Sequence, residues 1–175
     1  MIYLSGSTIS DLPKDFGFMA TPKNGAGLAR DGRPWACDNG AYTGVFDEKV
    51  YFNFLIRMLV FQSSCLFVTC PDELLNPLKT LQLFSRYSQK IKDLGYPLAF
   101  VCQDGQEDHS LPDCDAIFIG GSTAWKLGKG ADTCIKAAKE KNLWVHVGRV
   151  NTKNRIRHFM ARGVDSVDGT CIGYG

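Results

Sequence analysis

The sequence predicts an α/β fold, namely a compact (β/α)8 barrel of the TIM type, complete or incomplete, formed by residues 1–175 as a single domain. Three observations support this: eight short apolar runs have the length of strands, helical patterns separate several of them, and 175 residues suffice for one domain. Strands that alternate with helices form parallel sheets, and eight strands favour closure into a barrel. A flavodoxin-like open sheet is the alternative, because a typical barrel of this kind needs about 250 residues.

The eight predicted strands are runs of apolar, β-branched or aromatic residues, each of which stops at or near a Gly, Pro, Asn or Asp. They cover residues 2–5, 16–21, 35–37, 66–69, 98–102, 116–119, 144–147 and 166–167. Helical periodicity is clearest at residues 49–62, 77–94, 131–142 and 152–162. Because the chain is short for a barrel, we expect loops or single turns as the early crossovers. We also expect the last helix to be missing or supplied by a partner, which leaves an oligomer open.

The composition excludes several classes of protein. Hydrophobic residues make up 45% and charged residues 22%, which is typical of globular proteins rather than of disordered or fibrous ones. No apolar run approaches the ~20 residues that span a bilayer, and residues 1–6 lack the features of a signal peptide, so we expect a cytoplasmic protein with no membrane partner. The seven cysteines are scattered singly, and His109, His146 and His158 do not have metal-ligand spacing. We therefore expect reduced thiols and no metal site.

The distribution of charge is more informative than its sum. A net charge of +2 does not by itself indicate a nucleic-acid-binding protein. Between Lys126 and Arg162, however, ten Lys or Arg residues stand against two acidic ones, so this part of the chain could contact a phosphate backbone. Lys153 and Arg155 are the candidate phosphate contacts. The alternative interpretation is a solvated outer helix face.

Polar residues and glycines follow most of the predicted strands. In a parallel barrel the functional residues gather where the strands end, so we expect these residues to converge on one rim. In chain order they are Asp38, Asn39, Tyr42, Asp72, Gln103, Gly120, Gly121, His146, Arg149 and Asp168. Each also has a simpler interpretation: the Asp-Asn-Gly segment at 38–40 could be a turn, and Ser122 or Thr123 could cap a helix.

The order of these segments resembles the tRNA-guanine transglycosylase superfamily, and most closely the phage and bacterial enzymes that place 7-deazaguanines in DNA. Segment 38–42, Asp-Asn-Gly-Ala-Tyr, is similar to the Asp-Ser-Gly-Gly-Phe segment of that family, and Asp72 is similar in place to its base-recognition aspartate. Segment 101–105 resembles its Val-Gln-Gly segment, and Gly120 with Gly121 its Gly-Gly loop. Residues 148–168 resemble its glycine-rich loop, helix and Arg-Gly-Val-Asp strand. The Cys-rich zinc subdomain and the basic insertions that grip tRNA are not found in this sequence.

The resemblance implies a transglycosylase or glycosylase that cleaves the N-glycosidic bond of a base in nucleic acid, with DNA favoured over tRNA. It assigns Asp168 as the nucleophile and Asp38 as the residue that manages protons. The base and substrate contacts that we expect are Asn39, Tyr42, Asp72, Gln103, Gly120, Gly121, His146 and Arg149. A free purine or 7-deazapurine base could close the intermediate, or water could leave an abasic site, and no cofactor is needed. A non-catalytic nucleotide- or base-binding module and an accessory subunit are the alternatives.

Overall fold

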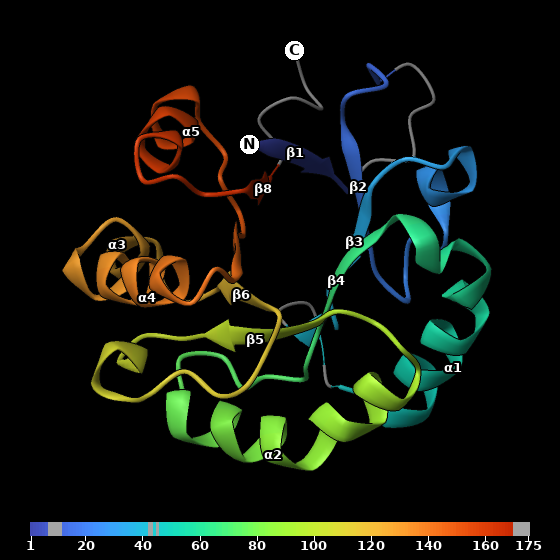
Figure 1. Ribbon diagram of the computed structural model, residues 1–175, viewed down its shortest axis with the longest axis horizontal. Helices are drawn as coiled ribbons and strands as arrows, with labels where there is room; N and C mark the ends of the chain where they lie inside the picture. The colour runs from blue at the N-terminus through green and yellow to red at the C-terminus, as the bar shows by residue number, and fades with distance from the viewer. Residues whose placement is uncertain (7–11, 42–43, 45, 170–175) are drawn as a thin grey trace.

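The computed structural model describes residues 1–6, 12–41, 44 and 46–169, in which eight parallel strands form a closed barrel in chain order (Figure 1). The strands are β1 (Ile2–Ser5), β2 (Gly17–Ala20), β3 (Trp35–Cys37), β4 (Cys65–Thr69), β5 (Leu98–Cys102), β6 (Ala116–Ile119), β7 (Trp144–Val147) and β8 (Ser166–Asp168). Pairing of β1 with β8 closes the barrel. The predicted (β/α)8 architecture is thereby confirmed, and the flavodoxin-like open sheet is excluded.

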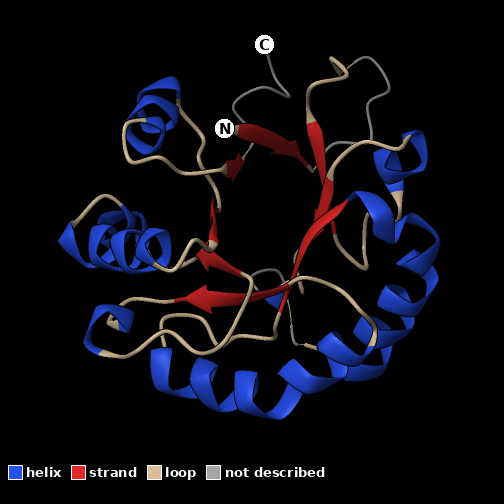
Figure 2. Ribbon diagram, viewed as in Figure 1, coloured by secondary structure: helices blue, strands red, loops and turns tan. Residues whose placement is uncertain are grey.

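Helices surround the ring of strands (Figure 2). They are α1 (Glu48–Met58), α2 (Pro77–Asp93), α3 (Thr123–Lys126), α4 (Lys129–Glu140) and α5 (Lys153–Met160), with 3-10 helices η1 (Gly27–Asp31), η3 (Leu59–Ser64) and η4 (Gln106–Asp108). The predicted helix at 49–62 is thus α1 continued by η3, and α3 is the helix that Ser122 or Thr123 was expected to cap. In the described residues, the first two crossovers contain no α-helix, as the short chain led us to expect. The prediction about a helix after β8 concerns residues outside the described part of the chain.

Side chains at the N-termini of the helices determine where the helices begin. Asp47 and Asn76 each accept a hydrogen bond of 3.0 Å from a backbone N–H in the first turn of α1 and α2. Ser122 accepts one from Trp125 N at 3.2 Å and so caps α3. Since these helices run back along the outside of the barrel, their first turns lie at the end where the strands finish.

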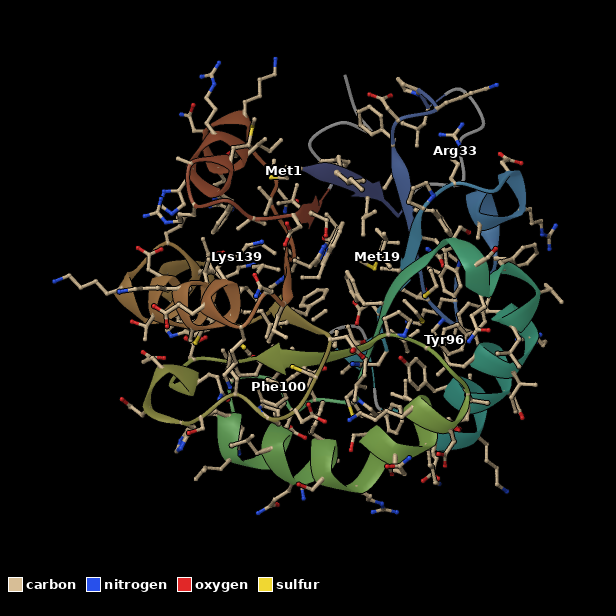
Figure 3. All side chains as sticks on the ribbon, in the orientation of Figure 1. Met1, Met19, Arg33, Tyr96, Phe100 and Lys139 are labelled. Carbon is tan, nitrogen blue, oxygen red and sulfur yellow. The ribbon has the colours of Figure 1, made fainter. Side chains whose placement is uncertain are left out.

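The core has an outer and an inner part because alternate strand residues point out of and into the barrel. Phe100 packs outward against Phe84 of α2, while Met19 belongs to the inner cluster, and Figure 3 shows both positions. The inner cluster consists of Leu4, Met19, Ala36, Phe67, Ala99, Val101, Ala116 and Phe118. On β7 and β8 the alternation brings polar side chains inward instead, with His146 against the Phe118 ring. The barrel interior is therefore apolar on one side and polar on the other.

Three general properties bear on function. Among the described residues, no helix has both the length and the apolar character needed to cross a membrane. In the same part of the chain, no group of three or more His, Cys, Asp or Glu side chains could hold a metal ion. The described cysteines are all free thiols.

Candidate active site at the carboxyl rim of the barrel

A cavity of about 220 Å³ lies at the end of the barrel where the strands finish. It is lined by Thr21, Lys23, Asp38, Gly40, Asp72, Leu74, Val101, Gln103, Phe118, Gly120, Gly121, Arg149 and Asp168. The fold thus brings together seven of the residues expected from the sequence, from six different strand ends: Asp38, Asp72, Gln103, Gly120, Gly121, Arg149 and Asp168. This volume is below the ~300–1,000 Å³ of drug-sized ligand pockets, so the cavity suits one small ring system.

Asp168 ends β8 and is held by two donors, one on each carboxylate oxygen. The backbone N–H of Arg149 donates to Oδ1 at 2.8 Å, and His146 Nε2 lies 3.0 Å from Oδ2. Arg149 adopts a positive φ of 59°, which turns its N–H toward the carboxylate, and its guanidinium donates to the carbonyl oxygen of Gly121. The two hydrogen bonds fix the position of the carboxylate at the cavity, as a nucleophile requires.

A chain of buried side chains extends from Asp168 into the barrel. Ser166 Oγ lies 2.8 Å from His146 Nδ1 and accepts a hydrogen bond of 2.8 Å from Trp144 Nε1. An ionised carboxylate can only accept, so the hydrogen of a neutral His146 must be on Nε2. Nδ1 is then the acceptor of the Ser166 hydroxyl. Trp144, Ser166 and His146 therefore each donate to the next side chain, and the chain ends at Asp168, which accepts at the cavity.

His146 itself does not line the cavity, although we expected it to contact the substrate. Its side chain is fully buried beneath Asp168, with ring centroids 5.1 Å from Phe67 and 4.7 Å from Phe118. Its position indicates that it orients Asp168 rather than touching a ligand.

Asp72 is held by the amides of two neighbours. Asn39 Nδ2 donates to Oδ1 at 2.8 Å, and Gln103 Nε2 donates to Oδ2 at 2.6 Å. Burial raises the pKa of Asp72, while these two hydrogen bonds act to lower it. Asn39 is buried, also donates to Thr69 and Cys70, and is not among the cavity-lining residues. It therefore supports Asp72 from below, whereas Gln103 both supports Asp72 and lines the cavity.

Gln103 connects three loops at the rim. Its Oε1 accepts from Leu75 N at 3.0 Å and from Gly121 N at 3.2 Å, in addition to the hydrogen bond from its amide to Asp72. Gly121 has a positive φ of 50°, and a Cβ atom there would lie 2.5 Å from Asp104 Oδ1. The close approach of these loops explains the second glycine of the Gly-Gly segment.

Asp38 follows β3 and differs from Asp168 in its environment. Its Oδ1 accepts a hydrogen bond of 3.2 Å from Gly40 N. Burial, followed by the negative charge of Asp72 and by a smaller effect of Asp168, raises the pKa of Asp38 from 3.8 to about 7. Asp38 can therefore carry a proton near neutral pH, and it lines the same cavity as Asp168.

Lys126 is a buried cation close to this site that the sequence did not single out. Only 3% of it is exposed, and its Nζ donates to the carbonyl oxygen of Gly148 at 2.5 Å. Burial, with the charge of Arg149 second, lowers its pKa to about 8, and the charge of Asp168 acts in the opposite direction. This hydrogen bond fixes the loop at Gly148, and the backbone N–H of the next residue, Arg149, donates to Asp168. Nothing in the pattern around Lys126 distinguishes it from the other lysines of this basic stretch.

Other candidates lie away from the cavity or outside the described residues. Lys153 is exposed at the start of α5, and Arg155 lies in its first turn; neither lines the cavity. Tyr42 lies outside the described residues. Part of the basic stretch serves internal ion pairs, since Arg162 binds Asp132.

Comparison with protein-family models gives no match for this chain, and comparison with curated proteins gives none either. A small cavity that holds one protonatable carboxyl and one carboxylate fixed by two donors is suited to acid-assisted nucleophilic substitution.

Proposed function

We propose that this protein cleaves the N-glycosidic bond between a purine-type base and its sugar in a nucleic acid, DNA rather than tRNA. The observation that carries the proposal is the pairing of Asp168, held by two hydrogen-bond donors, with Asp38, whose pKa is raised to about 7, in one cavity. Enzymes that cleave glycosidic bonds with retention use two carboxyl groups in this way, one as nucleophile and one as acid and base.

The reaction has two steps. An oxygen of Asp168 attacks the anomeric carbon, so that a C–O bond forms while the C–N bond breaks and its electron pair passes to the base. Neutral Asp38 gives its proton to the departing base. In the second step the Asp38 carboxylate takes a proton from water or from an incoming base, whose oxygen or nitrogen displaces Asp168 from the sugar. Water leaves an abasic site, whereas a free 7-deazapurine completes an exchange.

Asp72 and Gln103 are suited to recognise the edge of a guanine-like base. Each oxygen of Asp72 accepts one hydrogen bond from a neighbouring amide and so retains one acceptor position for the N–H groups of a base. Gln103 Nε2 uses one of its two hydrogens on Asp72, and the other can be donated to a carbonyl oxygen. Val101 and Phe118 line the cavity and supply apolar surface for the faces of the ring.

The resemblance of the motif order to the DNA-modifying transglycosylases supports the same assignment. In that interpretation Asp38, Asp72, Gln103, Gly121 and Asp168 keep the roles that the resemblance implies, and the cavity-lining set contains all of them. Lys153 and Arg155 would approach the phosphates beside the target nucleotide, because the first turn of α5 lies at the rim.

Mass analysis of defined polymers tests the proposal. Guanine-containing single- and double-stranded DNA and tRNA are incubated with the protein, with and without a free 7-deazaguanine. We expect base loss or exchange in DNA that is abolished by Asp168→Asn, reduced strongly by Asp38→Asn and unaffected by Asp93→Asn, which changes an exposed carboxylate on α2. If no polymer changes while a base or nucleotide binds in the cavity, the enzyme proposal is refuted and the site is a binding module.

A further inference from the structure

The loop between β4 and α2 presents leucines to solvent at the mouth of the cavity. Leu74 is 44% exposed and lines the cavity, and Leu75 next to it is 54% exposed. Because the two leucines are adjacent and lie at the mouth of a cavity, they form a small apolar surface that a ligand in the cavity would leave beside its neighbours.

Leu75 is held in an unfavourable backbone conformation. Its φ is +58°, in the left-handed region that glycine and asparagine adopt far more readily than leucine. Its N–H donates to Gln103 Oε1 at 3.0 Å, and the flanking Thr80 hydroxyl accepts from Glu73 N at 3.1 Å and donates to Asn76 O at 2.9 Å. The loop is therefore fixed in place, with a strained and exposed leucine at its tip. Such strain persists where the residue serves a function.

The same hydrogen bonds tie the loop to the residues around the cavity. Gln103, which holds the Leu75 N–H, also donates to Asp72 at 2.6 Å and accepts from Gly121 N. A ligand that is recognised by Asp72 and Gln103 therefore has Leu74 and Leu75 at a fixed position beside it.

We propose that Leu74 and Leu75 form an apolar wedge that enters a DNA duplex and fills the space from which the target base has been flipped; the inference rests on the proposed function. The cavity of about 220 Å³ takes one ring system, so a base paired in a duplex must leave the stack to reach it. Apolar side chains that insert between base steps stabilise a duplex from which a base has left the stack. The bases on each side of the gap would cover the exposed parts of the two leucines with apolar surface. Duplex DNA is thereby assigned as the substrate form that the wedge serves.

Binding to defined DNA tests the wedge without reference to catalysis. The probes are a fluorescent duplex with a guanine·cytosine pair at its centre, the same duplex with a tetrahydrofuran abasic site in place of the guanine, and the guanine single strand. We expect the wild-type protein to bind the abasic duplex more tightly than the intact duplex by about tenfold, as the burial of a half-exposed leucine would give. Leu75→Asn should lose this preference and keep its thermal stability, because asparagine tolerates the positive φ. Leu75→Phe should retain the preference, since a phenyl ring can fill the gap.

Val60→Asn is the matched control. Val60 is 78% exposed in η3, which precedes β4 and so lies at the opposite end of the barrel, and its replacement should leave the preference unchanged. Equal binding of the abasic and intact duplexes by the wild type, or a preference that survives in Leu75→Asn, would overturn the wedge. Base release is scored separately on the same polymers. If the wild type and Leu75→Asn release the base from duplex DNA equally, the wedge alone is refuted. If the preference for the abasic duplex depends on Leu75 but no base is released, the proposed function alone is refuted.

Discussion

The raised pKa of Asp38 makes a prediction about stability that does not depend on the substrate. Because the folded protein binds the Asp38 proton more tightly than the unfolded chain, Asp38 contributes stability at low pH that is lost as the pH rises from about 4 to about 7. The change in pKa from 3.8 to about 7 corresponds, at 1.36 kcal/mol for each tenfold change in proton affinity, to about 4 kcal/mol in full. Solvent at the cavity mouth screens part of this, so we expect about 2 kcal/mol.

Asp38→Asn removes the ionisable group and keeps an oxygen for the hydrogen bond from Gly40 N. Urea unfolding of the wild type and the variant, at about pH 5 and at about pH 8, measures the effect. The free energy of unfolding of the variant, relative to that of the wild type, should rise by about 1 kcal/mol between the two pH values, because pH 5 to 8 covers only the upper part of the range between the two pKa values. Asp93→Asn, at an exposed position, should show no such rise. If the free energy of unfolding of Asp38→Asn, relative to that of the wild type, is the same at both pH values, Asp38 is ionised near neutral pH and cannot be the acid.

Three further variants test the support beneath Asp168. Gly148→Ala places a Cβ atom 2.6 Å from the Phe118 ring and should lower the free energy of unfolding by about 1–3 kcal/mol in urea titrations. His146→Leu removes one of the two donors to Asp168 and should reduce base release by about tenfold or more, measured by mass analysis of the DNA. Lys126→Met keeps the apolar stem and removes a buried charge, so stability should be maintained while base release falls because the loop at Gly148 is no longer anchored.

The fold could be predicted from the sequence because its signals are local. Each strand is a short apolar run ended by a turn residue, and all eight runs correspond to strands of the closed barrel. The least accurate boundary was that of the first long helix, where η3 continues α1 from Leu59 to Ser64. A 3-10 turn that extends a helix keeps nearly the same apolar spacing, so periodicity cannot separate the two.

The cavity-lining residues were predictable for a different reason: parallel strands place all their carboxyl ends on one rim. We could therefore place Asp38, Asp72 and Asp168 at one rim without knowing any distance between them. What could not be predicted was depth within the barrel. His146 and Lys126 lie near the same rim, but burial beneath neighbouring loops, which depends on the tertiary packing, makes them supports instead of contacts.

The two sides of the barrel interior give the two aspartates at one rim different surroundings. Asp168 stands on the polar side, where the Ser166 hydroxyl, the His146 ring and a backbone N–H are all oriented to donate toward it. Asp38 receives a hydrogen bond from Gly40 N and lies close enough to Asp72 to be affected by its charge. An ionised Asp38 would add its charge to those of Asp72 and Asp168 in the same small cavity, whereas a protonated Asp38 does not, and it can give its proton to a departing base. The arrangement requires that the donors stay on Asp168, so the buried chain through His146 is as necessary to the proposed reaction as the two carboxyl groups themselves.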